Sequence, residues 1–287
     1  MYPFEYAAPE TLDDALALLA SRGAESKPLA GGQSLIPILN YRLANPRVIV
    51  DLNRLPMGGI RIQGDRVTLG ALTRYCDLEE STEIARLCPM LGEAARLIGN
   101  VRVRALGTVG GSVAHADPAA ELPLATIALD ASLTLRSVRD TRRVPAADFF
   151  TSYLTTVLEP DELVTEIEIP VTRGKGTAVE ELARRAGDFA MVAVAAVVRV
   201  DPRGRVDEAR LAYGGVGPRP LRVPPAEDAL IGQEPTAERV AVAARTARAS
   251  IQPHADAFVS AAYRSLLVEV LGRRALTRAV HRALEAA

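Results

Sequence analysis

The sequence predicts an α+β protein built in two unequal parts. Up to residue 170, short β-branched runs alternate with segments whose apolar residues recur at helical spacing. After that point, three strand-like runs are followed by long helical segments. The chain has 287 residues, enough for one large domain or two ordinary ones. We therefore expect a mixed domain followed by a smaller domain of one sheet and several helices.

The first 56 residues predict a β-α-β-like unit. Thr11 is suited to cap a helix that begins with two acidic residues and ends at Gly23. Lys27–Ala30 and the β-branched run Arg47–Leu52 predict strands. We expect a short apolar helix over Leu35–Arg42 between these two strands.

Residues 57–176 predict a second α+β unit. Its expected elements are a hairpin at Arg61–Leu69, helices near Arg74–Ser81 and Pro89–Ile98, and half-buried strands at Leu133–Leu135 and Leu163–Ile169. Pro170 ends the last strand, and Val171–Thr177, with two glycines and two basic residues, is typical of a linker. We therefore divide the chain into domains of residues 1–176 and 177–287, the first with subdomains of about 1–56 and 57–176.

The C-terminal domain predicts a small sheet covered by helices. The expected strands are Ala178–Leu182, Met191–Asp201 and Ala209–Gly214, with a turn at Pro202–Gly204. The expected helices are Pro225–Ile231, Ala237–Ser250 and about Ala261–Ala286, the last interrupted near Gly272. A glycine cluster at Tyr213–Gly217 follows a late strand and is expected to be a turn.

Composition excludes several classes of partner. A formal net charge of -1 gives no support to binding of nucleic acid or acidic membranes, and 4% aromatic residues without Trp leave few stacking platforms for bases. The longest apolar run, Ala190–Val198, is too short to span a bilayer. The first residues have neither the basic nor the apolar segment of a signal peptide. A cytoplasmic location is therefore expected.

The cysteines and histidines predict no metal held by this chain. Two thiols, Cys76 and Cys88, exclude a disulfide framework and cannot supply all four ligands of an iron–sulfur cluster. His115, His254 and His281 are scattered, without the spacing of a metal-ligand motif.

Two glycine-paired loops are the strongest functional signal. One is Ala30-Gly31-Gly32-Gln33-Ser34-Leu35 and the other Thr108-Val109-Gly110-Gly111-Ser112, each expected where a strand ends. Glycine removes the Cβ that blocks close backbone approach, and successive N–H groups can then converge on an anion. Because a single loop of this kind is often only a tight turn, it is the pair that indicates a large phosphate-bearing cofactor.

Several polar residues near the second loop invite competing interpretations. Arg102 and Arg104 are equally suited to neutralise a phosphate and to form the solvated face of a strand. His115 has no nucleophile or carboxylate dyad beside it, which favours a structural role over catalysis. Asp117 is expected to orient its loop by bonding to nearby backbone ahead of Pro118.

The string Ile98–Pro118 and the loop Ala30–Leu35 together resemble the FAD-binding subunit of molybdenum hydroxylases, in particular the medium subunit of aerobic carbon monoxide dehydrogenases and the FAD domain of xanthine dehydrogenase. The resemblance extends along the whole chain, and Arg184–Ala190 resembles part of the C-terminal flavoprotein domain. It implies a vanillyl-alcohol-oxidase-type (PCMH-type) fold, with FAD held between two α+β subdomains and the C-terminal domain.

The resemblance also implies a set of FAD-binding residues. Carried over, the pyrophosphate cradle is Ala30, Gly31, Gly32, Gln33, Ser34, Leu35, Thr108, Gly110, Gly111 and Ser112. Glu121 stands where relatives place a carboxylate near the ribityl or adenosine part, Val164 where the backbone meets adenine, and Phe189 where an aromatic residue lies near the isoalloxazine ring. The chain departs from its relatives at Gln33, where a His is common, and at Glu180 and Glu181, where a Lys is frequent.

The function implied is electron transfer within a complex. A large subunit with a molybdenum cofactor oxidises the substrate, a small subunit with two two-iron two-sulfur clusters relays electrons, and FAD on this chain passes them to an external acceptor, in a dimer of heterotrimers. We assign no catalytic residue, since no acid–base or nucleophile constellation is present. A stand-alone flavin-dependent oxidase or dehydrogenase is the alternative, and a scaffold without flavin is a third class. Substrate and acceptor stay open.

Overall fold

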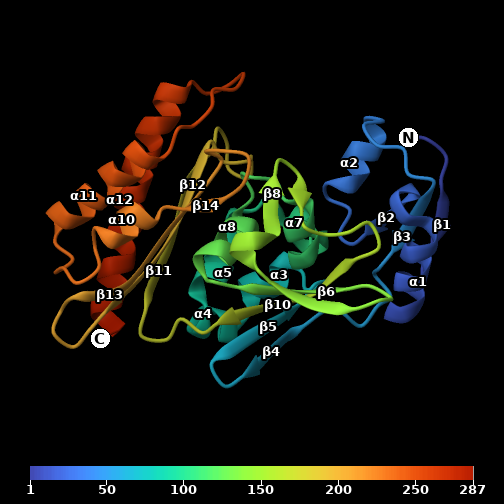
Figure 1. Cartoon of the computed structure of the whole chain (residues 1–287), viewed down its shortest axis with the longest axis horizontal. Helices are drawn as coiled ribbons and strands as arrows, with labels where there is room; N and C mark the ends of the chain where they lie inside the picture. The colour runs from blue at the N-terminus through green and yellow to red at the C-terminus, as the bar shows by residue number, and fades with distance from the viewer. Residues whose placement is uncertain (287) are drawn as a thin grey trace.

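The structure is a computed structural model that describes residues 1–286, and it has three parts arranged in a row (Figure 1). The N-terminal unit and the C-terminal domain lie at opposite ends, with the central unit between them. Sheets of three, five and four strands, together with a two-stranded ribbon, are interspersed with helices. The predicted α+β class is confirmed.

The N-terminal unit is a small parallel sheet with its helices. Its elements are β1 (Glu5–Ala7), α1 (Leu12–Arg22), a 3-10 turn (Gly23–Glu25), β2 (Ser26–Leu29), α2 (Leu35–Asn40) and β3 (Val48–Asp51). Thr11 caps α1 as predicted, because its hydroxyl accepts a hydrogen bond from the Asp14 N–H at 3.1 Å. Strands β2 and β3 precede and follow α2 in the sequence, and they pair in parallel. This confirms the β-α-β prediction.

The central unit is an antiparallel sheet with a layer of short helices. Its elements are β4 (Ile60–Gln63), β5 (Arg66–Gly70), α3 (Tyr75–Glu80), α4 (Thr82–Leu87), α5 (Pro89–Leu97), α6 (Val101–Leu106), α7 (Val109–His115), α8 (Glu121–Ala128), β6 (Ser132–Arg136), β7 (Thr141–Pro145), α9 (Ala146–Phe149), β8 (Phe150–Ser152), β9 (Thr155–Thr156) and β10 (Leu163–Pro170). The sheet order is β4-β5-β10-β6-β7. Ile167 of β10 pairs with Leu69 on one side and Leu133 on the other, and all three are fully buried.

The prediction of a strand before the second glycine pair is wrong, because α6 and α7 occupy this segment. The Asn100 side chain accepts bonds from the first N–H groups of α6, and the Thr108 hydroxyl does the same for α7. These caps, together with tertiary packing, outweigh the β propensity of the two valines in α6. Arg102 and Arg104 therefore lie on a helix and not on the face of a strand.

The C-terminal domain is an antiparallel sheet with long helices on its outer face (Figure 1). Its elements are β11 (Gly176–Leu182), β12 (Val192–Val200), β13 (Val206–Gly214), β14 (Leu221–Arg222), α10 (Pro224–Asp228), α11 (Ala237–Ser250) and α12 (Ala261–Ala286). The predicted interruption near Gly272 is wrong, since α12 is continuous. Gly272 instead gives room to Tyr213, whose hydroxyl donates to the Val268 carbonyl at 3.1 Å and would overlap a Cβ at residue 272.

Both faces of this sheet are buried, which fixes its position against the central unit. Val194 and Ala196 of β12 face the core shared with α12, while Ala193 and Ala195 face the core of the central unit. Helix α8 packs on that second face against β12 and β13, and every one of its residues is buried. The near-continuous apolar sequence of β12 follows from this burial on two sides.

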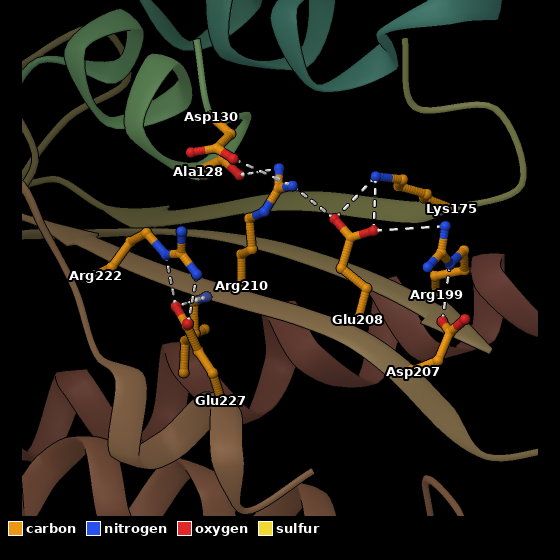
Figure 2. Close-up of polar contacts among 10 residues, drawn as sticks. Ala128, Asp130, Lys175, Arg199, Asp207, Glu208, Arg210, Arg222 and Glu227 are labelled. Carbon is orange, nitrogen blue, oxygen red and sulfur yellow. Dashed lines mark hydrogen bonds and ion pairs between the residues drawn. The ribbon is translucent and has the colours of Figure 1, made fainter. Parts of the chain in front are cut away.

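A polar cluster on β13 joins the sheet to the end of α8 (Figure 2). The Arg210 guanidinium reaches the Ala128 carbonyl at 3.4 Å and the Asp130 carboxylate at 3.6 Å. On its other side it pairs with Glu208 at 2.8 Å, which also pairs with Lys175 at 2.7 Å. Because the network binds the C-terminal end of α8 to the sheet, it helps to fix the position of the N-terminal end of that helix.

Candidate cofactor site

A cavity of about 750 Å³ opens where the three parts meet, and the predicted site residues all lie on its wall. The N-terminal unit contributes the first glycine loop, the central unit α7 and the start of α8, and the C-terminal domain the loop after β11. The lining includes Ala30, Gly31, Gly32, Gln33, Ser34, Leu35, Thr108, Gly110, Gly111, Ser112, Glu121, Val164 and Phe189. A volume of this size suits an extended organic cofactor.

The first glycine loop lines the cavity and has unused backbone donors. Within residues 1–286, the N–H groups of Gly31, Gly32, Gln33 and Ser34 have no hydrogen-bond partner. Gly32 has φ of +69°, in the left-handed region that favours glycine. At Gly31 a Cβ would overlap the Leu106 carbonyl oxygen, so only glycine lets this loop pass so close to the end of α6. A row of free N–H groups is suited to binding an anion.

The second glycine loop has a different role, because its N–H groups are already bonded within the protein. The bonds run from Val109 N to Thr73 O at 3.0 Å, Gly110 N to Ala71 O at 2.8 Å, Gly111 N to Thr108 Oγ1 at 3.1 Å, and Ser112 N to Thr108 O at 2.9 Å. A Cβ on Gly110 would come within 2.5 Å of the Ala71 Cβ. These glycines therefore allow α7 to pack tightly on the strand end of β5. Of the two glycine pairs, only the first therefore has backbone N–H groups without a partner in residues 1–286.

The wall of the cavity carries more acids than bases. Among its described lining residues the single Lys or Arg is Lys27, whereas the carboxyl groups are those of Asp117, Glu121, Glu159, Glu162 and Asp188. Glu162 is neutralised by Arg142 at 2.7 Å, and this partner lowers the pKa of the Glu162 carboxyl. On this wall the unbonded N–H groups of the first loop therefore outnumber the cationic side chains that an anion could meet.

Glu121 is the most unusual of these acids. It is the first residue of α8, and 5% of its surface is exposed. Burial raises the pKa of its carboxyl to about 8, and the neighbouring carboxylates of Glu181 and Asp117 add to the effect. Near neutral pH the group is mostly protonated and can donate a hydrogen bond into the cavity.

The remaining predicted contacts lie on other parts of the wall. Val164 is buried on β10, beside an irregularity in its pairing with β6 at Val164 and Glu166. Phe189 stands at the rim with 61% of its surface exposed. Asp188 and Phe189 also line a second cavity of about 450 Å³, which reaches Arg264 and Phe258. An exposed aromatic ring at the mouth of a cavity is a natural stacking partner for a planar ligand.

The residues with open interpretations now have defined surroundings. Arg104 bonds Glu79 at 2.8 Å, and neither it nor Arg102 is among the residues that line the cavity, so the structure adds no support to a phosphate-neutralising role for them. His115 lies on the wall at the end of α7, where burial lowers its pKa. Asp117 accepts a bond from the Ala119 N–H at 2.9 Å, which confirms its predicted loop role.

Tyr75 is a wall residue that the sequence did not reveal. Its ring fills the space next to Gly107, and burial raises the pKa of its hydroxyl to about 12. It stands at the start of α3, far in the sequence from both glycine loops, and no motif marks it.

In residues 1–286 there is no cluster of three or more His, Cys, Asp or Glu arranged to hold a metal ion. No helix in that range has the length and apolarity needed to cross a membrane.

Comparisons with known proteins agree with this arrangement. Residues 2–172 match the family model described as the FAD binding domain in molybdopterin dehydrogenase, and residues 177–279 match the CO dehydrogenase flavoprotein C-terminal domain. The chain is 38% identical to the 6-hydroxypseudooxynicotine dehydrogenase complex subunit alpha of Paenarthrobacter nicotinovorans, over 98% of this chain and 95% of the relative. It is also 38% identical to the carbon monoxide dehydrogenase medium chain of Hydrogenophaga pseudoflava, over 96% of each.

Solved structures give the same result. A chain of carbon monoxide dehydrogenase from Hydrogenophaga pseudoflava superposes with a TM-score of 0.95 at 40% identity, covering 98% of this chain and 99% of the other. A chain of quinoline 2-oxidoreductase from Pseudomonas putida 86 superposes with a TM-score of 0.94 at 32% identity, covering 99% of both.

Proposed function

Because the chain belongs to the family of FAD-binding subunits of molybdopterin dehydrogenases, we propose that it is the electron-transfer subunit of a molybdenum-containing hydroxylase or dehydrogenase complex. It accepts electrons from iron–sulfur clusters of a partner subunit and passes them to an external acceptor. The observation that carries this proposal is the cavity itself, with its row of free N–H groups at one place and an exposed aromatic ring at another.

The residues on the wall fit FAD. When bound, FAD supplies the two-electron redox chemistry, and the protein supplies binding, orientation and electrostatics. We assign the N–H groups of Gly31–Ser34 to the diphosphate, because they are the free donors on a wall that is poor in cations. Thr108 and Ser112, at the start of α7, line the same cavity and are proposed to lie beside the diphosphate. Leu35, the first residue of α2, follows the first loop and also lines the cavity.

The other assignments follow the shape of the wall. The backbone at Val164 is proposed to meet the adenine, and Glu121 to bond the ribityl or adenosine part as a protonated carboxyl. Phe189 is proposed to stack beside the isoalloxazine ring, since it is the exposed aromatic side chain on this rim. No side chain is assigned a catalytic role.

The partners are proposed from the composition of this chain and the names of its relatives. Several relatives are medium chains or subunits of complexes. Two cysteines cannot hold two iron–sulfur clusters, so the clusters must lie on another chain. We propose a large subunit with the molybdenum cofactor and a small subunit with two two-iron two-sulfur clusters, assembled as a dimer of heterotrimers in the cytoplasm.

We also propose that the chain is divided into two consecutive functional domains. Residues 1–176 form the FAD-binding domain, with subdomains of about 1–56 and 57–176, and residues 177–287 form the flavoprotein C-terminal domain. The separate apolar clusters of the N-terminal unit and of the outer C-terminal layer support this division.

Reconstitution tests the proposal. The purified chain, incubated with FAD and desalted, is expected to retain flavin absorbance, and its flavin is expected to be reduced by substrate only when the partner subunits are present. Loss of all flavin on desalting would contradict the cofactor site. Reduction of the flavin by an alcohol or amine in the isolated chain would instead support the stand-alone oxidase or dehydrogenase.

A further inference from the structure

Two loops on the cavity wall touch through their backbones. The α5–α6 loop (residues 98–100) belongs to the central unit, and the β11–β12 loop (residues 183–191) belongs to the C-terminal domain. A Cβ placed on Gly187 would lie 2.6 Å from the Gly99 carbonyl oxygen and 3.2 Å from the Gly99 Cα. Both glycines line the cavity. The central unit and the C-terminal domain therefore meet here main chain against main chain, with no side chain between them.

Arg104 of α6 binds the same carbonyl. Its Nη1 donates to the Ile98 carbonyl at 3.2 Å and to the Gly99 carbonyl at 3.4 Å. Its Nε donates to the Glu79 carboxylate at 2.8 Å, and the Arg104 side chain is 18% exposed. A guanidinium is a rigid planar fork of donors, so the bond to Glu79 orients the Nη1 that reaches the two carbonyls. The Gly99 oxygen is therefore held by a largely buried cation and contacted by Gly187.

The contact between the glycines links the β11–β12 loop to the central unit. The bond from the Met191 N–H to the Leu182 carbonyl, at 2.8 Å, closes the base of this loop within the C-terminal domain. Gly187 reaches the central unit through Gly99, two residues before the exposed Phe189. Two residues of chain span at most about 7 Å, so a displacement of Gly187 carries Phe189 with it. The place of this ring at the cavity rim therefore depends on the place of Gly99.

Capping of α5 accounts for only one of the two carbonyl bonds. Ile98 is the C-cap of that helix, and arginine side chains commonly bond the last carbonyls of a helix. The Gly99 carbonyl lies one residue beyond the cap, and it is the atom against which Gly187 packs. A cap alone affects the stability of the fold, whereas a bond to Gly99 also affects the rim of the cavity.

We propose that Arg104 is a positioning residue of the cofactor site. By holding the Gly99 carbonyl it fixes the surface against which Gly187 packs, and through the β11–β12 loop it sets where Phe189 stands at the cavity rim. The inference rests on the FAD site proposed above, in which the Phe189 ring lies beside the isoalloxazine. Arg104 is not among the residues that line the cavity, so it acts through the main chain.

A tryptophan reporter tests the proposal without flavin. The chain has no Trp, so Phe189→Trp places a single indole at the cavity rim of the full, flavin-free chain. Adding Arg104→Ala is expected to lower the fluorescence anisotropy of this indole, because the loop gains motion on the nanosecond timescale. Arg102→Ala is the matched control, since Arg102 is exposed on the same helix, and it is expected to leave the anisotropy unchanged. If Arg104→Ala fails to fold, Arg104→Lys replaces it, since lysine keeps the charge beside Glu79 and lacks the fork.

FAD affinity tests the same contact from both of its sides. Arg104→Ala and Gly187→Ala are each expected to raise the Kd for FAD about tenfold, measured by flavin fluorescence titration of the full chain. Because both changes break one contact, the double variant is expected to fall well short of the roughly hundredfold rise that independent effects would give.

Gly204→Ala is the control for backbone strain in this titration. Gly204 has φ of +79°, close to the +83° of Gly187, and both angles lie in the left-handed region that favours glycine. Among residues 1–286, a Cβ at residue 204 meets no atom within 4 Å apart from its chain neighbours. Gly204→Ala is therefore expected to keep the wild-type Kd.

The outcomes separate this inference from the proposed function. Unchanged anisotropy in a folded Arg104 variant, or a double variant whose Kd equals the product of the two single effects, would overturn the positioning role and leave the FAD site intact. A lower melting temperature with unchanged anisotropy would show that Arg104 only caps α5. If the wild-type chain does not bind FAD, the proposed FAD site is wrong, and the anisotropy of the flavin-free chain still decides whether Arg104 holds the loop.

Discussion

At the residue scale, the buried carboxyl of Glu121 makes the stability of the flavin-free chain depend on pH. Burial raises its pKa from 4.5 to about 8, so the folded state holds a proton that the unfolded state has released. Stability is therefore greatest below pH 4.5 for this group and falls as pH rises through about 8. We expect Glu121→Gln to raise the free energy of unfolding at pH 9 by roughly 1–3 kcal/mol and to change it little at pH 5.

Chemical denaturation at the two pH values checks this prediction. Asp65→Asn is the control, since the Asp65 side chain is 90% exposed and should shift stability equally at both. An equal effect of Glu121→Gln at pH 5 and pH 9 would argue that its carboxyl is ionised throughout.

Gly31 supports a second prediction at this scale. A Cβ there would collide with the Leu106 carbonyl and with Gly107, which are backbone atoms and cannot rotate away. Gly31→Ala is therefore expected to push the first loop off α6, with a loss of about 1–3 kcal/mol in stability and a weaker Kd for FAD. Gly58→Ala is the matched control, because a Cβ at residue 58 meets its nearest atom at an ordinary 3.9 Å. Similar Kd values for the two variants would rule out this close approach as a requirement for binding.

At the element scale, the junction of α12 with β13 reverses the usual effect of a helix substitution. Gly→Ala in a helix normally stabilises by about 1 kcal/mol. Here a methyl group at residue 272 would collide with the Tyr213 hydroxyl, so Gly272→Ala is expected to destabilise the chain by about 1–3 kcal/mol. Adding Tyr213→Phe removes the hydroxyl and should recover part of the loss. A double-mutant cycle measured by thermal unfolding reports this coupling, and purely additive effects would contradict it.

The elements also show which parts of the fold a sequence can predict. Strands β10, β12 and β13 and helices α1 and α11 carry strong periodicity or clear caps, and they appear where expected. The run Val101–Arg104 has β-forming valines, and its helix is decided by Asn100 and by packing of Val103 against the central core. That packing involves residues distant in the sequence, so local pattern could not reveal it.

The same limit applies to the site. The glycine pairs and the resemblance to a family predicted a set of site residues, and the structure places all of them on the wall of one cavity. They did not distinguish the loop with free N–H groups from the loop with bonded ones, because two of the four acceptors for the second loop are the carbonyls of Ala71 and Thr73, some forty residues earlier in the chain.

At the scale of the whole molecule, the C-terminal domain completes both the core and the cavity. Ala193, Ala195 and Ala212 of its sheet belong to the apolar cluster of the central unit, and Gly187–Phe189 line the cavity. A fragment of residues 1–176 would expose the apolar face of α8, so we expect it to aggregate or to melt well below the full chain and to retain no FAD after desalting. Size-exclusion chromatography and flavin absorbance test this. A monomeric fragment with bound FAD would show that the first domain is self-sufficient.

The free donors of the first loop belong to the main chain, and this has a consequence for how the protein tolerates mutation. A side-chain substitution leaves an amide N–H in place, and only proline deletes it. The contacts that we propose for the N–H groups of Gln33 and Ser34 would therefore be largely invisible to alanine scanning, which would wrongly suggest that these positions contribute nothing. Evolution can change the side chains of such a loop and keep its N–H donors, provided that the two glycines are retained and the backbone follows the same path.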